Sequence, residues 1–167
     1  PHQVPILGIN MGRVGFMTEL TEEEAIRELP AYLEGGSRVE QRMMLEAAIS
    51  PGSGDAPLQT LHALNDVVVG RGATARLLDI DTAVDGVPLT TYRADAVIVS
   101  TATGSTGYAL SAGGPIIHPE AKVMLVQPVA AHLGLREGLI LEQDSVVQLR
   151  PSDSHPPTLS VDGFSDV

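Results

Sequence analysis

The chain has 167 residues, enough for one ordinary domain with a single hydrophobic core, or for one domain and part of another. Hydrophobic residues make up 43% of it, a fraction typical of a packed globular protein and too high for a disordered one. The net charge of −11 disfavours nucleic acids and anionic membranes as partners, and the absence of Cys excludes disulfides and thiolate metal sites. With no pattern of a secretory signal or a transmembrane run, we expect a cytoplasmic protein.

The first elements along the chain are predicted to be a strand and a helix. Residues 4–9 form an apolar run that we expect to be a buried strand leading into a glycine-rich turn. Thr21 and Glu24 fit a capping box, so a helix should begin directly after Thr21 and end at residues 35–36, which are both Gly. Pro30 lies inside this helix and is expected to kink or weaken it.

Beyond residue 38 the pattern becomes one of strands. Residues 75–84 alternate between apolar and polar positions, and Asp85-Gly86 then gives a two-residue hairpin turn into a strand that Pro88 places at a sheet edge. Further strands are expected at 42–49, 62–69, 95–101, 122–127, 139–142, 145–150 and 158–162. The gaps between them are too short for crossover helices, which argues against a parallel α/β fold. We therefore predict a mainly β fold, as a sandwich or barrel.

The stretch 95–119 contains the most informative pattern. An apolar strand runs directly into a loop of small residues rich in hydroxyl groups, namely those of Ser100, Thr101, Thr103, Ser105, Thr106 and Ser111. Such a loop lets a ligand approach the main chain closely and offers the donors and acceptors that ribose and adenine require. A tight turn capped locally by Ser and Thr explains the same composition. No Lys follows the glycines, so the loop is not a Walker A loop.

Other polar residues are candidates for binding. Asn65 and Asp66 lie within an otherwise apolar run, so they are either satisfied at a turn, bulge or strand end, or directed at a ligand. His118 and His132 are candidates for ligand contacts or bases near neutral pH, although a single His is more often a satisfied structural residue. Neither has a partner at a helical metal-ligand spacing, so a zinc site is not expected. Phe16 offers a ring face to a base.

Taken in chain order, these motifs resemble the NAD kinase family. They are Gly-Ile-Asn-x-Gly-x-x-Gly-Phe-x-Thr over 8–18, Leu-Asn-Asp over 64–66, the strand after Asp95, the loop over 100–119 and Val-Asp-Gly over 161–163. The resemblance covers nearly the whole chain, and the loop is its most specific part. It implies that residues 38–167 form a C-terminal β-sandwich domain that binds NAD and is truncated at its end. Residues 1–37 would then be the last strand and helix of an α/β ATP-binding domain.

The resemblance also implies an activity, which is transfer of the γ-phosphoryl group of ATP to the 2′-hydroxyl of the adenosine ribose of NAD, giving NADP, with Mg²⁺. The implied partners are small-molecule nucleotides and further copies of the chain in a dimer or tetramer. By position, the residues implied to bind NAD are Phe16, Asn65, Asp66, Asp95, Thr103, Thr106, Gly107, Tyr108, Ser111 and His132. The family's Gly-Gly-Asp-Gly motif, which holds ATP and supplies the general base, does not occur in this sequence. We therefore predict no catalytic residue and no metal ligand in these 167 residues, and no activity of the polypeptide by itself.

The sequence departs from the family pattern at several positions. Asp66 is one methylene shorter than the usual Glu, Ala96 and Ala102 replace a Gly and a Pro, and a Gly-Leu-Arg-Glu-Gly run follows His132 and Leu133. Two other interpretations stay open. One is a lipid or other small-molecule kinase of the same superfamily, and the other is a non-catalytic nucleotide-binding or oligomerisation module.

Overall fold

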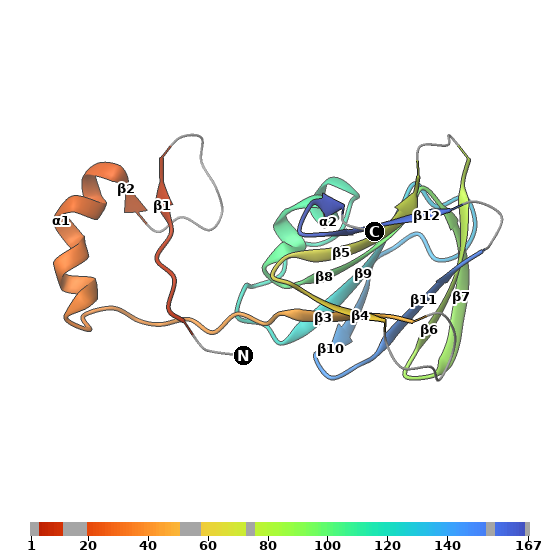
Figure 1. Ribbon diagram of the computed structural model, residues 1–167, viewed down its shortest axis with the longest axis horizontal. Helices are drawn as coiled ribbons and strands as arrows, with labels where there is room; N and C mark the ends of the chain where they lie inside the picture. Colours follow the sequence, from red (N-terminus) through yellow and green to blue (C-terminus); the bar gives the residue numbers. More distant parts are fainter. Residues whose placement is uncertain (1–3, 12–19, 51–57, 73–75, 153–155, 166–167) are drawn as a thin grey trace. The chain divides into compact units, whose positions relative to one another are not determined.

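The computed structural model describes residues 4–11, 20–50, 58–72, 76–152 and 156–165. The chain separates into two compact units, Pro1–Gln41 and Arg42–Val167. Figure 1 shows a single long helix in the first unit and packed strands in the second. No helix in the described ranges is both long enough and apolar enough to cross a membrane.

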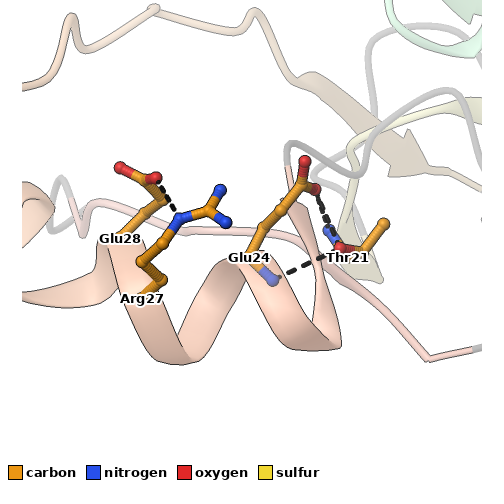
Figure 2. A network of polar contacts seen from close by, with 4 residues as sticks. All are labelled: Thr21, Glu24, Arg27 and Glu28. Atoms are coloured by element: carbon orange, nitrogen blue, oxygen red, sulfur yellow. Dashed lines mark hydrogen bonds and ion pairs between the residues drawn. The ribbon is translucent and has the colours of Figure 1, made fainter.

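The predicted capping box begins the helix of the first unit, α1 (Glu22–Leu33). The Thr21 hydroxyl accepts a hydrogen bond from the Glu24 backbone N–H at 3.3 Å, and the Glu24 carboxylate accepts one from the Thr21 N–H at 2.9 Å (Figure 2). These two bonds satisfy backbone donors that the first helical turn leaves free. The helix continues through Pro30, whose carbonyl still accepts from the Glu34 N–H at 3.0 Å.

The predicted buried strand over residues 4–9 is wrong. Only β1 (Ile9–Asn10) forms, paired in parallel with β2 (Leu20–Thr21). Val4 is 70% exposed and Ile6 is 87% exposed. A buried strand needs partners at its edges and cover on its faces, and among the described residues β1 pairs only with the two residues of β2. Apolar composition alone therefore overestimated this element.

The second unit is built from antiparallel strands, most of which overlap the predicted runs, and this confirms the mainly β fold. They are β3 (Leu45–Ile49), β4 (Gln59–Ala63), β5 (Asp66–Arg71), β6 (Leu78–Val84), β7 (Val87–Ala94), β8 (Ala96–Thr101), β9 (Val123–Val129), β10 (Leu139–Glu142), β11 (Val147–Pro151), β12 (Pro157–Val161) and β13 (Phe164–Ser165). Six of them form one sheet in the order β10-β9-β8-β5-β12-β13. A second sheet has the order β11-β6-β7, and β3 pairs with β4.

The predicted hairpin turn is present between β6 and β7. Asp85 has φ 51° and Gly86 has φ 78°, and positive φ at both central residues is what a type I′ turn requires. The β7 strand lies at the edge of its sheet, which agrees with the position of Pro88.

Two apolar clusters bury both faces of the central strand β8. Val97 and Val99 face the larger cluster, which also contains Ile80 and Tyr92 of the smaller sheet. Between them, Ile98 points to the opposite face of the sheet. There it packs in the second cluster with Ala109 and Leu125, and Ala109 belongs to the short helix α2 (Tyr108–Ser111). Every residue of β8 is buried, so the strand is a rigid support for the loop that follows it.

Candidate functional site

The polar segment 64–66 divides the predicted strand 62–69 into two. The first part ends with β4 at Ala63, and β5 begins at Asp66. The single strand predicted there is therefore wrong, and the strand-end alternative is the one observed. We call residues 64–66 the junction. It lies at one end of β5, and the β5–β8 register places Asp66 opposite Ser100.

Asp162 holds the junction from a distant part of the chain. Its carboxylate accepts three consecutive backbone N–H groups, from Leu64 at 2.8 Å, from Asn65 at 2.7 Å and from Asp66 at 3.0 Å. In return, the Asp162 N–H donates to the carbonyl of Asp66 at 3.0 Å. A carboxylate that accepts several backbone N–H groups forms charge-assisted bonds, which are stronger than neutral ones. The sequence had shown Asp162 only as part of the Val-Asp-Gly motif, and the junction contact was missed.

The segment 101–107, which we call the loop, is tied to the junction from the other side. The Thr101 hydroxyl donates to the Leu64 carbonyl at 2.6 Å and accepts from the Gly104 N–H at 3.0 Å. The Thr101 N–H donates to the Asn65 carbonyl at 2.9 Å. Because Thr101 is fully buried at the end of β8, these bonds fix the junction and the start of the loop as one structure.

Gly104 brings the two segments into direct backbone contact. A Cβ at this position would lie 2.7 Å from Asn65 Cα and still closer to the Asn65 carbonyl group, a separation that no side chain permits. Gly104 opens the short 3₁₀ helix η1 (Gly104–Thr106). The close approach therefore requires glycine because of space, and not because of an unusual backbone angle.

Some of the predicted loop hydroxyls are structural. The Ser105 side chain is fully buried, donates to the Ala102 carbonyl at 2.7 Å and accepts from the Ile117 N–H at 3.0 Å. Ser100 is also fully buried, and its hydroxyl donates to backbone carbonyls, including that of Thr101 at 2.9 Å. For these residues the explanation by local capping applies. Their hydroxyl groups shape the loop and leave other members to face a ligand.

The other residues predicted as binding residues in the stretch 95–119 lie nearer the surface. Thr106 is half-buried, Gly107 and Ser111 are exposed, and Tyr108 is 46% exposed at the start of α2. Thr103 is the exception, because only 5% of it is exposed and its hydroxyl lies 3.4 Å from Nη1 of Arg42.

The junction presents two polar side chains without partners. Asp66 is only 7% exposed, and within the described residues neither its carboxylate nor the side-chain amide of Asn65 makes a hydrogen bond. Burial, together with the nearby charge of Asp162, raises the pKa of Asp66. The oxygens of this carboxylate are not themselves fully buried, so they are open to a ligand, and the raised pKa of a mostly buried carboxyl group makes Asp66 a candidate for contacting one.

Two predicted site residues, Asp95 and His132, are not brought together with the junction and the loop. Asp95 directly precedes β8, and Thr101 is the last residue of that strand, so the two lie six residues, or roughly 20 Å, apart. Its carboxylate pairs with Arg71 at 2.7 Å. His132 is exposed at the Asp95 end of the sheet, where its N–H donates to the Arg93 carbonyl at 2.8 Å. Phe16 lies outside the described residues.

A metal site built from side chains does not occur in the described part of the chain. No three or more His, Cys, Asp or Glu residues gather there in a group able to hold an ion. The one carboxylate beside Asp66, that of Asp162, is already occupied by backbone donors. The chemistry offered by the junction and the loop is therefore hydrogen bonding to a polar organic ligand.

Two family models match the chain. The model of the ATP-NAD kinase C-terminal domain matches residues 64–167, and that of the ATP-NAD kinase N-terminal domain matches residues 1–37. The chain belongs to the NAD kinase family. The first match includes the junction, the loop and Asp162, and the resemblance stated from the sequence is confirmed.

Relatives from bacteria cover almost all of the chain. It is 44% identical over 164 residues to an NAD kinase of Dehalococcoides mccartyi, a match that covers 98% of this chain and 57% of that protein. An NAD kinase of Chloroflexus aurantiacus is 37% identical over 167 residues, covering 100% of this chain and 60% of that protein. The chain thus spans a little over half the length of these relatives.

Solved structures of NAD kinases share the fold. Yeast NADH kinase complexed with NADH matches with a TM-score of 0.89 and 30% identity, covering 98% of this chain and 47% of that one. An NAD kinase from Archaeoglobus fulgidus in complex with ATP matches with a TM-score of 0.80 and 30% identity, covering 98% and 61%. These likenesses agree with the predicted mainly β architecture.

Proposed function

We propose that this chain is part of an enzyme that phosphorylates the 2′-hydroxyl of the adenosine ribose of NAD with ATP, giving NADP, and that the junction and the loop supply its NAD site. The observation that carries the proposal is the unpartnered pair Asn65 and Asp66, held by backbone bonds against the Gly104 turn. An amide and a carboxylate can receive and offer the hydrogen bonds of adenine and ribose.

The family and the named complexes support the choice of ligand. The yeast relative was solved with NADH and the archaeal relative with ATP. In this proposal the half-buried Thr106, the exposed residues Gly107, Tyr108 and Ser111, and the buried Thr103 border the adenosine. Phosphoryl transfer depends on positioning and charge neutralisation more than on covalent chemistry by the protein. The part assigned to this chain is therefore to hold the acceptor hydroxyl in place.

The finer parts of the proposal extend beyond the junction and the loop. We assign residues 1–37 to the end of the ATP-binding domain and residues 38–167 to the NAD-binding domain. Asp95 stays a prediction for the nicotinamide end of the dinucleotide, Phe16 for the cavity around adenine and ribose, and His132 for a contact with NAD. So do a cytoplasmic setting and a homo-oligomer. The described residues do not fit a protein-built Mg²⁺ site, so we assign no metal ligand to them.

A thermal-shift titration tests the proposed ligand. NAD at 100 times its Kd should stabilise the folded chain by about 2.7 kcal/mol and so raise its Tm by several degrees. Asn65→Ala and Thr106→Val should each reduce this shift. Thr106 is suited to the test because the one hydrogen bond that its hydroxyl donates, to the Thr103 carbonyl, is 3.3 Å long.

Thr60→Val is the matched control, since Thr60 is exposed on β4 and outside the junction and the loop. It should leave the NAD shift unchanged. A wild-type chain whose Tm is insensitive to millimolar NAD, NADP and ATP would refute the proposal and favour a non-catalytic module. A shift produced only by a phospholipid headgroup would favour the lipid-kinase alternative.

A further inference from the structure

Asp162 occupies a turn that fixes where its carboxylate points. Asp162 and Gly163 are the two residues between β12 and β13, and their φ angles are 49° and 81°. Positive φ at both central positions is typical of a type I′ turn, which Asp-Gly adopts readily. The register of β12 with β5 pairs Val161 with Val67, so the turn emerges directly beside the junction.

The carboxylate and Thr101 hold opposite sides of the same short backbone. Asp162 Oδ1 accepts the N–H groups of Asn65 and Asp66, and Oδ2 accepts that of Leu64. The carbonyls of Leu64 and Asn65 point the other way and accept from Thr101. With the donors and acceptors of the backbone occupied, the side chains of Asn65 and Asp66 are left as the groups available to a ligand.

We propose that Asp162 is a positioning residue of the nucleotide site, which aims Asn65 and Asp66 at the ligand without touching the ligand itself. The inference rests on the proposed function. It adds that a residue about 97 positions further along the chain sets the geometry of the acceptor site. Misplacement of a binding group by about 1 Å is enough to reduce productive binding strongly.

The charge of Asp162 has a second effect on the same site. Together with burial, it raises the pKa of Asp66. Thr101 and Ser100, which face the junction from β8, are neutral, so the charge that acts on Asp66 is that of Asp162. Removing this charge should therefore lower the pH at which Asp66 ionises. The pH below which NAD binding weakens should therefore fall as well.

Asp162→Asn is the sharp test, because Asn also tolerates positive φ but offers one acceptor oxygen in place of two. The chain contains a matched control. Asp85-Gly86 is a second turn of the same type, and the Asp85 carboxylate likewise accepts a backbone N–H, from Val146 at 2.7 Å. Asp85→Asn thus removes a comparable turn-stabilising bond in the other sheet, away from the junction and the loop.

Calorimetric titration of NAD into the 167-residue chain gives the decisive comparison. We expect Asp162→Asn to weaken NAD binding by about tenfold or more, and to move the acid limb of a Kd-against-pH profile to lower pH. Asp85→Asn should bind NAD within about twofold of wild type. Wild-type affinity and an unchanged pH profile in Asp162→Asn would overturn the positioning role while leaving the proposed function intact. Absence of NAD binding to the wild type would overturn both.

Amide hydrogen exchange keeps the proposal testable if Asp162→Asn does not fold. In the wild-type chain the N–H groups of residues 64–66 should exchange as slowly as those of β5, because each is bonded to a carboxylate. Exchange of the junction as fast as that of an open surface loop would show that Asp162 does not hold it, and would overturn the inference.

Discussion

Replacing Gly104 by Ala puts a methyl group where the backbone of Asn65 already lies. The new Cβ would be 2.7 Å from Asn65 Cα, whereas ordinary contact begins at 3.4 Å. The loop and the junction must therefore separate by about 0.7 Å to relieve this contact, and by more to relieve the closer contacts with the Asn65 carbonyl group. Because both segments are held by buried hydrogen bonds to Thr101, the movement also strains those bonds.

The size of the effect follows from this displacement. Overpacking of a closely packed site costs about 1–3 kcal/mol of unfolding free energy. A displacement near 1 Å at a site that must hold a ligand in one geometry costs on the order of 100-fold. We therefore expect Gly104→Ala to fold with reduced stability and to bind NAD about 10- to 100-fold more weakly.

Gly70→Ala is the control for a methyl group added in the same sheet. Gly70 lies on β5 towards its far end, and its Cβ would meet the Ala96 methyl group at 3.3 Å, a tight contact that small shifts relieve. It should cost less than about 1.5 kcal/mol and leave NAD affinity unchanged. Urea unfolding measures the stability of both variants, and calorimetry measures NAD affinity. If Gly104→Ala binds NAD as tightly as Gly70→Ala does, the contact between loop and junction is not needed for binding.

Three further predictions concern single side chains. Thr101→Val removes a buried hydroxyl with two bonding partners and should cost about 1–3 kcal/mol in urea unfolding; a loss below about 0.5 kcal/mol would contradict the role given to it. Asp66 has a raised pKa, so its contribution to the stability of the folded chain is favourable at acid pH and is lost as the pH rises through the raised value. Asp66→Asn should therefore have a higher Tm than wild type at pH 7, with the gain vanishing below the ordinary pKa of 3.8; the same gain at both pH values would be inconsistent with this cause. Thr21→Ala removes the N-cap of α1 and should speed amide exchange in residues 22–33 by about fivefold, whereas unchanged exchange would mean that the cap is dispensable.

Strand positions were predictable where local pattern and turn chemistry agreed. The alternation over 75–84 and the Asp85-Gly86 turn specify a hairpin almost by themselves, and the structure has it. The run 4–9 shows the limit of this reasoning. Apolar composition indicates that a strand is possible, but pairing partners decide whether it forms and is buried.

The sequence predicted which residues belong to the site better than it predicted how they are arranged. Asn65 and Asp66 stood out as polar residues in an apolar run, and they are unpartnered in the structure as a ligand site requires. The sequence did not separate fully buried hydroxyls such as that of Ser105 from half-buried ones such as that of Thr106, because both occur in the same short loop. Nor did it reveal Asp162, whose contacts arise from pairing between β5 and β12.

The location of the NAD site is the central claim, and hydrogen exchange with and without NAD tests it most directly. The account predicts that NAD binding slows exchange more in residues 64–66 and 101–108 than in the β6–β7 hairpin of the other sheet, which gains only the overall stabilisation by the ligand. Protection that spares the junction and the loop, or that centres on the β6–β7 hairpin, would contradict it.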